Sequence, residues 1–262
     1  MRKLQLVFYY LLHIRLDTSC NFIVSSPAYG SWSVYLRSGE QSSAKIEYSA
    51  FLDDKIEARV DNDGYLYLKV RRSIGITRND LKAVVTIPKI EYIKASGASY
   101  IYSEGVFEGK ANKIELNGAS KINSLTYRGN DIDITLNGAS RCNMSGMAER
   151  AKIEANGSSE AAMPDFTTKT LEIYLNGSSD AFITITERAT GKLSGASKLR
   201  YRGNADLSGV HLSGTPYIEG QYLNNQKEGT WKYYNPKGEI TEEIIYKNGN
   251  QMKTTRYELK KD

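Results

Sequence analysis

The sequence predicts an all-β fold, a parallel β-helix of about 20 residues per coil, with an N-terminal cap of β-strands and C-terminal β-hairpin repeats. One observation is a turn of the form Asn/Ser-Gly-Ala/Ser-Ser that recurs at a period of about 20 residues. Its copies begin at Ser96, Asn117, Asn137, Asn156, Asn176 and Ser194. The other observation is that apolar and polar residues alternate beside each turn, which is the pattern of a strand with one buried face. No helical periodicity of adequate length occurs in this region, so the repeats favour stacked coils of strand and turn.

Three columns of mostly apolar residues appear when the repeats are aligned on the turn glycine, and they define the expected core. The column four residues before the glycine contains Ile93, Ile114, Ile134, Ile153, Ile173 and Gly191. The column two residues before it contains Ala95, Leu116, Leu136, Ala155, Leu175 and Leu193. The column four residues after it contains Ile101, Ile122, Cys142, Ala161, Ala181 and Leu199. We expect like positions to stack at the strand spacing of roughly 4.8 Å.

The turn residues are expected to form a structural ladder. Glycine takes a positive φ without a Cβ clash, and stacked Asn or Ser side chains can bond to their copies in the next coil. This ladder comprises Ser96, Gly97, Asn117, Gly118, Asn137, Gly138, Asn156, Gly157, Asn176, Gly177, Ser194 and Gly195. An outward column of alternating charge is expected beside it, formed by Lys113, Asp133, Lys152 and Glu172.

The composition argues against several classes of function. The net charge of the 262 residues is +5, but the basic residues are interspersed with acidic ones, so nucleic-acid binding is not indicated. Cys20 and Cys142 are the only cysteines, and we do not expect them to pair because Cys142 falls in a buried column. With His13 and His211 the only histidines, no His/Cys metal site of standard spacing can be assembled, and no cofactor is expected.

Residues 1–29 resemble an export signal followed by a linker. Arg2 and Lys3 precede an apolar run of eleven residues, Leu4 to Ile14, which is too short to span a bilayer. Thr18 and Ser19 are small residues of the kind that precede a lipid-modified Cys, here Cys20. The alternative is a frayed or mis-started terminus, since several polar residues interrupt the pattern.

The rest of the chain divides into three parts. Residues 30–216 form the expected β-helical domain, whose first strand-like runs lack the repeat and are expected to cover the first coil with irregular or antiparallel strands. Residues 217–250 contain two short hairpin patterns. Residues 251–262 form a charged tail that is expected to fray.

Two resemblances to known families rest on these motifs. The segment from Val84 to Ser99, the recurring Asn-Gly-Ala-Ser turns, and the closing run from Leu193 to Gly203 resemble the "putative auto-transporter adhesin, head GIN domain" family, DUF2807, over residues 30–216. The resemblance implies a right-handed β-helix in an exported, often lipid-anchored protein of the bacterial envelope, and no catalytic residues. The run containing Gly229-Thr230-Trp231, Tyr234, Gly238, Tyr246 and Gly249 resembles short bacterial MORN-type repeats, β-hairpin modules linked with protein or membrane contacts.

The function expected from these features is a non-catalytic binding or scaffold module of the cell envelope or surface. Its partner would be a protein or glycan ligand, with a membrane contact only through a lipid anchor. Contact residues would include the tyrosines expected to be exposed, Tyr100, Tyr102, Tyr127, Tyr174 and Tyr201. The alternative is a β-helical polysaccharide lyase or hydrolase using the outward carboxylates of Asp131, Asp133, Glu154 and Glu172. A purely structural envelope protein is also consistent with the sequence. The Ser42-x-x-Lys45 pattern matches part of a serine-hydrolase motif, but it is interpreted as chance because its companion motifs are absent.

Overall fold

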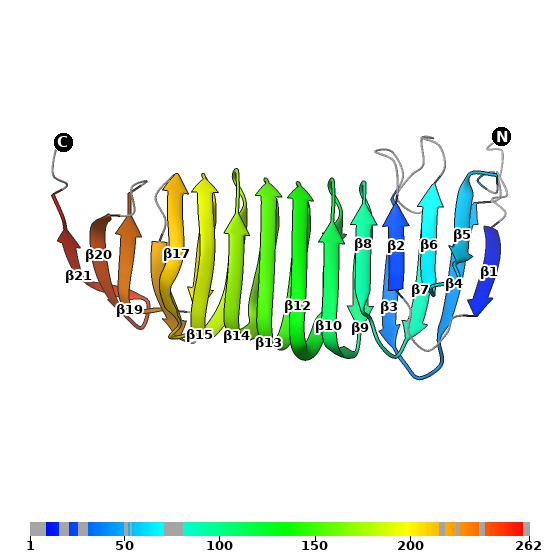
Figure 1. Ribbon diagram of the computed structural model, residues 1–262, viewed down its shortest axis with the longest axis horizontal. Helices are drawn as coiled ribbons and strands as arrows, with labels where there is room; N and C mark the ends of the chain where they lie inside the picture. The colour runs from blue at the N-terminus through cyan, green and yellow to red at the C-terminus, as the bar shows by residue number, and fades with distance from the viewer. Residues whose placement is uncertain are drawn as a thin grey trace, which may run out of the picture.

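A computed structural model describes residues 9–15, 21–25, 31–49, 52, 54–70, 81–214, 218–223, 226–235 and 239–258. Almost all of these residues lie in strands or turns, and the strands stack side by side into one elongated body (Figure 1). Within the described ranges, no helix is long and apolar enough to cross a membrane. The predicted all-β architecture is therefore confirmed.

A solenoid of parallel strands occupies the middle of the molecule. Each long strand pairs in parallel with its counterpart about 20 residues further along the chain, so that Ile134 lies opposite Ile153 and Ile153 opposite Ile173. The strands run continuously around the bends of the coil (Figure 1). They are β10 (Val106–Leu116), β12 (Thr126–Gly138), β13 (Arg141–Gly157), β14 (Glu160–Leu175) and β15 (Asp180–Gly195). Shorter strands complete the stack: β8 (Tyr92–Ser96), β9 (Tyr100–Glu104), β11 (Lys121–Ile122), β16 (Lys198–Arg202) and β17 (Asp206–Gly214).

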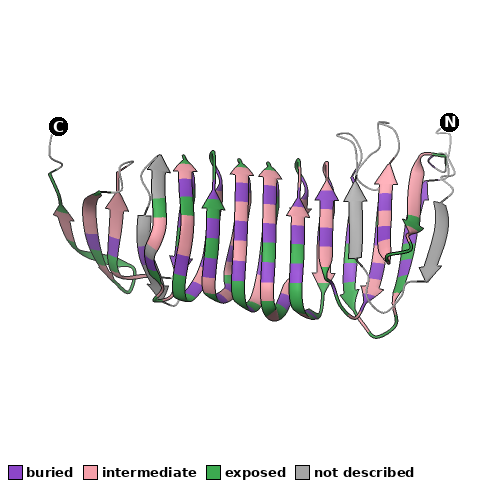
Figure 2. Ribbon diagram, in the orientation of Figure 1, coloured by how far each residue is buried: buried purple, intermediate pink, exposed green. Residues whose placement is uncertain are grey.

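The three predicted columns form the core. Every residue named in them is buried except Gly191, and the alternation of buried and outward residues is visible along the long strands in the middle of the stack (Figure 2). Gly191 stands opposite Ile173 with a φ of 139°, and a Cβ there would lie 1.9 Å from the Ile173 backbone oxygen. A larger residue is therefore excluded at this one position of the isoleucine column.

The turn asparagines bond to one another along the solenoid axis. The amide of Asn137 donates to Oδ1 of Asn117 at 2.9 Å, and the amide of Asn156 donates to Oδ1 of Asn137 at 3.0 Å. Asn176 continues the series by donating to Asn156 at 2.9 Å. Because each amide both donates and accepts, the row holds successive turns in the same register.

The turn glycines and serines complete this corner. All six glycines have positive φ, and at Gly157 (φ 81°) a Cβ would lie 2.8 Å from the backbone oxygen of Gly138. The last serine of each turn is buried. Ser120 and Ser179, for example, donate to the backbone oxygens of Ala95 and Ala155 at 3.2 and 3.1 Å. Their hydroxyls therefore satisfy buried carbonyl groups, as expected of structural residues.

The N-terminal side of the stack is more parallel than expected. Strand β3 pairs in parallel with both β7 and β9, and β2 pairs in parallel with both β6 and β8. Antiparallel pairs occur only beyond these, where β4 joins β7 and β1, and β5 joins β6. The difference arises because β2 lies between β6 and β8, and β3 between β7 and β9, so both are inserted between strands that come later in the chain. The strands are β1 (Tyr9–Arg15), β2 (Asn21–Ser25), β3 (Ser33–Ser38), β4 (Ser43–Ser49), β5 (Ile56–Val60), β6 (Tyr65–Val70) and β7 (Leu81–Ile87).

A separate antiparallel sheet follows the solenoid at the C-terminus. It contains β18 (Ile218–Leu223), β19 (Gln226–Tyr234), β20 (Ile240–Lys247) and β21 (Asn250–Arg256). Trp231 is buried and contacts Tyr246 edge to face at 6.1 Å between ring centroids. Strand β21 pairs with β20, so the segment expected to fray as a charged tail begins with an ordered strand.

Candidate functional site

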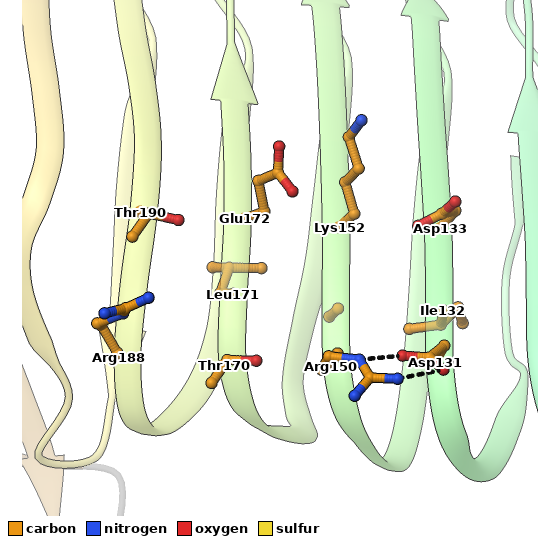
Figure 3. A pocket seen from close by; sticks show the side chains of 11 residues that line it. Asp131, Ile132, Asp133, Arg150, Lys152, Thr170, Leu171, Glu172, Arg188 and Thr190 are labelled. Atoms are coloured by element: carbon orange, nitrogen blue, oxygen red, sulfur yellow. Dashed lines mark hydrogen bonds and ion pairs between the residues drawn. The ribbon is translucent and has the colours of Figure 1, made fainter.

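One face of the solenoid carries two parallel rows of polar side chains, here called the charged face. The rows are in register across β12, β13, β14 and β15 (Figure 3). The first row contains Asp131, Arg150, Thr170 and Arg188, and the second contains Asp133, Lys152, Glu172 and Thr190. Because consecutive coils stack at roughly 4.8 Å, neighbouring members of a row are within reach of one another.

A hollow of about 320 Å³ lies between the two rows. Its floor is formed by Ile132, Ala151 and Leu171, whose side chains are almost completely buried. Ala151 is the smallest residue of that floor, and Thr170 and Thr190 are short members of their rows. The depression therefore arises where small side chains of neighbouring coils coincide, while the longer charged side chains form its rim.

Half of the charged groups around the hollow, namely Asp131, Arg150 and Lys152, form ion pairs within the chain. Arg150 binds both carboxylate oxygens of Asp131, at 2.5 and 2.8 Å (Figure 3). Lys152 lies 2.9 Å from Glu154, two residues further along its own strand. Lys113 likewise pairs with Glu115 at 2.8 Å.

The expected column of alternating charge exists, but its ion pairs differ from a simple ladder. Lys113, Asp133, Lys152 and Glu172 do lie opposite one another in sequence along the stack. The two lysines nevertheless reach the carboxylate two positions on in their own strand, because residues i and i+2 share one face of a strand. Burial by itself would raise the pKa of Glu115. The interactions of its carboxylate with Lys113, Lys94 and Tyr92 outweigh burial and lower the pKa to about 2.

Three charged groups at the hollow form no ion pair with any described residue, namely Asp133, Glu172 and Arg188. The carboxylate of Glu172 interacts with the Tyr174 hydroxyl and raises the pKa of Tyr174. The lining as a whole balances Asp131, Asp133 and Glu172 against Arg150, Lys152 and Arg188. The hollow thus offers hydrogen-bond donors and acceptors in similar number and has little net charge.

Three of the four candidate catalytic carboxylates, those of Asp131, Asp133 and Glu172, line the hollow, whereas Glu154 does not. Asp131 and Glu154 are each held in an ion pair, and Lys152 stands between Asp133 and Glu172 in the row. Among the described residues, no group of three or more His, Cys, Asp or Glu side chains could hold a metal ion. Lys45 of the Ser-x-x-Lys pattern pairs with Glu47 at 2.9 Å.

The tyrosines expected to be exposed divide into two groups. Tyr127 and Tyr201 are buried, which contradicts the expectation. Tyr127 fills a bend of the coil and donates to the backbone oxygens of Gly109 and Asp131, at 3.3 and 3.0 Å, and burial raises its pKa to about 12. Tyr174 is exposed to 36%, whereas Tyr100 and Tyr102 are half-buried.

The sequence reasoning missed an aromatic pair on another face. The ring of Tyr35 stacks on that of Tyr102 at 5.0 Å between centroids, and Tyr35 is itself exposed. The parallel pairing of β3 with β9 brings these residues together. No local pattern could have indicated it, because the two tyrosines lie far apart in the chain.

A larger groove of about 670 Å³ runs along a different bend of the solenoid. Its floor includes Gly109, Gly129 and Ala148, and Met147 on its wall is 54% exposed. Lys169 and Glu149 on its rim neutralise each other at 2.8 Å. Among its described lining residues there is no aromatic side chain, in contrast to the charged face, which has Tyr174 beside it.

The two cysteines have different positions. Cys142 is a free, buried thiol whose pKa is raised to about 12 by burial. Cys20, the proposed lipidation site, lies outside the described residues.

Comparison with known proteins agrees with this architecture. The structure of a "putative adhesin" from Bacteroides fragilis is 14% identical with a TM-score of 0.67, covering 79% of this chain and 94% of that chain. A "putative adhesin" from Parabacteroides merdae is 15% identical (TM-score 0.56), and a "putative lipid binding protein" from Parabacteroides distasonis is 12% identical (TM-score 0.56), each covering 79% of this chain and 94% of the other. These likenesses show the fold alone.

No curated protein matches the chain. The family model described as "Putative auto-transporter adhesin, head GIN domain" (DUF2807) matches residues 27–205, which is more than half of the sequence. The chain therefore belongs to the DUF2807 head GIN domain family.

Proposed function

We propose that the chain is a non-catalytic binding or scaffold module, exported to the cell envelope or surface of a bacterium. The observation that carries this proposal is the charged face. Its polar side chains are arranged in register on a rigid stack, and half of the candidate catalytic carboxylates are neutralised by ion pairs within the chain. The adhesin description of the family agrees with a role at the surface.

The rigidity of the stack favours binding because the face is already ordered before a ligand arrives. Continuous parallel pairing and the asparagine row hold each coil in register with the next. A preordered surface loses little conformational entropy on association, so a modest set of contacts suffices. The C-terminal sheet and the MORN-type segment, residues 217–250, would supply a second contact surface.

Attachment to the envelope would occur through Cys20, modified by lipid after cleavage of the preceding residues. Mass spectrometry of the mature protein is expected to show a lipid-modified Cys20 at the new N-terminus. An intact Met1 terminus in a cytosolic fraction would contradict both export and anchoring.

The test of the binding role uses intact cells that express the full chain with a C-terminal tag. After labelling with a membrane-impermeant reagent and mild crosslinking, the tagged protein is expected to be labelled and to co-purify with an envelope protein or glycan. A cytosolic protein with the same tag serves as the control. Absence of surface labelling together with absence of any envelope partner would refute the proposal.

A polysaccharide lyase or hydrolase is the second candidate, because Asp133 and Glu172 face the hollow without an ion pair to a described residue. This enzyme would depolymerise a polysaccharide, and Asp133→Asn would abolish the reaction with the fold intact. Loss of activity in that variant alone would replace the binding role with a catalytic one. Degradation that is equal in the variant and the wild type would instead point to a contaminating enzyme.

A further inference from the structure

We propose that the hollow on the charged face binds a neutral oligosaccharide, with one sugar ring on Tyr174 and the hydroxyls of a neighbouring sugar on Glu172, Asp133 and Arg188. The inference rests on the proposed binding function and names its ligand class. It is carried by three features of the hollow: balanced charge, an exposed aromatic ring beside it, and unpaired polar groups at its rim.

The balance of charge favours a ligand without net charge. Three carboxylates and three basic groups line the hollow, and the Arg150–Asp131 pair is closed by two hydrogen bonds. Asp133 and Arg188 have no ion-pair partner among the described residues. A sugar hydroxyl both donates and accepts, so it can satisfy a carboxylate and a guanidinium in turn without adding charge.

The Tyr174 side chain provides the apolar contact. Its ring is 36% exposed, and the neighbouring Glu172 carboxylate raises the pKa of its hydroxyl. Lys152 places its ammonium group 5.9 Å from the ring centroid. An exposed aromatic ring presents a flat apolar surface next to polar groups, which suits the mixed faces of a pyranose ring.

The size of the site fits a short segment of a sugar chain. The volume of about 320 Å³ is at the lower end of small-ligand sites, which range over about 300–1,000 Å³. Tyr174 lies four residues beyond Thr170 on β14, and Thr170 is opposite Arg188 on β15. At about 3.3 Å per residue this places the tyrosine roughly 13 Å from the guanidinium end of the hollow. A protein partner would need a much larger contact of roughly 800 Å² per side.

The experiment measures binding of the full-length protein to defined hexasaccharides by titration calorimetry. The probes are neutral hexasaccharides, namely β-1,4-glucan, β-1,3-glucan, α-1,4-glucan and mannan, with hexagalacturonate as the acidic counterpart. We expect at least one neutral probe to bind, with an affinity that changes by less than about twofold between low and high salt, because no ligand charge is screened.

Variants locate the site. Tyr174→Ala is expected to reduce affinity about tenfold or more, whereas Tyr174→Phe retains most of it because the ring remains. Glu172→Gln and Arg188→Gln are expected to reduce it by roughly ten- to a hundredfold, as for the loss of one charged hydrogen bond. The matched controls are Tyr35→Ala, which removes an equally exposed aromatic ring, and Arg128→Gln, which removes a guanidinium; both lie elsewhere on the solenoid and should change affinity by less than about twofold.

Each other outcome overturns the inference. Tighter, salt-sensitive binding of hexagalacturonate would assign the site to anionic ligands, and equal losses in the two control variants would place binding elsewhere. Failure of the folded wild type to bind any probe, with melting curves that verify folding, would refute a neutral hexose ligand. Surface labelling and capture of an envelope protein would still succeed in that case. The labelling experiment therefore tests the binding role, and the calorimetry tests the oligosaccharide ligand independently of it.

Discussion

Replacing Ile153 by Asp is expected to unfold the repeat region. Ile153 is fully buried between Ile134 and Ile173, its in-register neighbours. Loss of its apolar burial removes about 1.5–3 kcal/mol, and a carboxylate buried without a partner costs several kcal/mol more. The sum, roughly 5 kcal/mol or more, is comparable with the whole stability of a typical domain.

Ile153→Ala provides a variant that is expected to fold. It should lose about 2–5 kcal/mol through the same contacts, without the buried charge. The matched outward change is Glu154→Lys, at the next position of the same strand. It removes an ion pair with Lys152 between side chains that are about 40% exposed, so the expected loss is below about 1 kcal/mol.

Thermal and urea melts followed by circular dichroism measure these differences. For a chain of this length, 1 kcal/mol corresponds to about 2–4 °C in Tm, so Ile153→Ala should melt roughly 5–20 °C below the wild type and Glu154→Lys within about 4 °C of it. Because coils are stabilised by their neighbours, the loss should extend to both sides of the altered coil. Equal destabilisation by the two variants, or a larger loss for Glu154→Lys, would refute the strand register.

Four further predictions concern the turns, the titrating groups and the thiol. Gly157→Ala should destabilise the protein by more than about 1 kcal/mol in urea melts, because φ is positive and a Cβ would meet the Gly138 oxygen; an unchanged midpoint would refute the turn geometry. Asn137→Ala removes two side-chain hydrogen bonds of the asparagine row and should lower the free energy of unfolding in urea melts by about 1–3 kcal/mol. An unchanged free energy of unfolding would mean that the row adds nothing to stability. The folded pKa of Glu115 is lowered to about 2 from 4.5, so its contribution to stability is present above about pH 4.5 and is lost as the pH falls toward 2; Glu115→Gln should flatten that part of the stability profile, and an identical acid dependence would contradict the shift. The peptide containing Cys142 should remain unlabelled by a maleimide in the native protein at neutral pH and react in denaturant, since burial raises the thiol pKa to about 12; rapid native labelling would exclude the buried position.

The sequence by itself determined the solenoid and its core. A column such as Ile134, Ile153 and Ile173 repeats at nearly constant spacing, and strand alternation leaves only one face for it to occupy. The structure buries all three residues. The repeat spacing and the alternation of apolar and polar residues can both be found in one sequence, because the first recurs along the chain and the second involves only neighbouring residues.

The bends of the coil were decided by tertiary packing. Tyr127 and Tyr201 lie outside the aligned columns, where alternation alone does not say which side of the bend a residue takes. Tyr127 turns inward because Gly109 and Gly129 leave room for its ring and the backbone accepts its hydroxyl. That choice depends on side chains from more than one coil.

The candidate site likewise combines both kinds of information. The sequence placed Asp133 and Glu172 in one outward row, and their register followed from the repeat. The hollow between the rows, the pairing of Arg150 with Asp131, and the insertion of β2 and β3 between later strands appear only in three dimensions. A repeat specifies which residues stack at a fixed offset, whereas cavity shape and ion-pair choice depend on the sizes and reach of several side chains that meet only after the coils have closed.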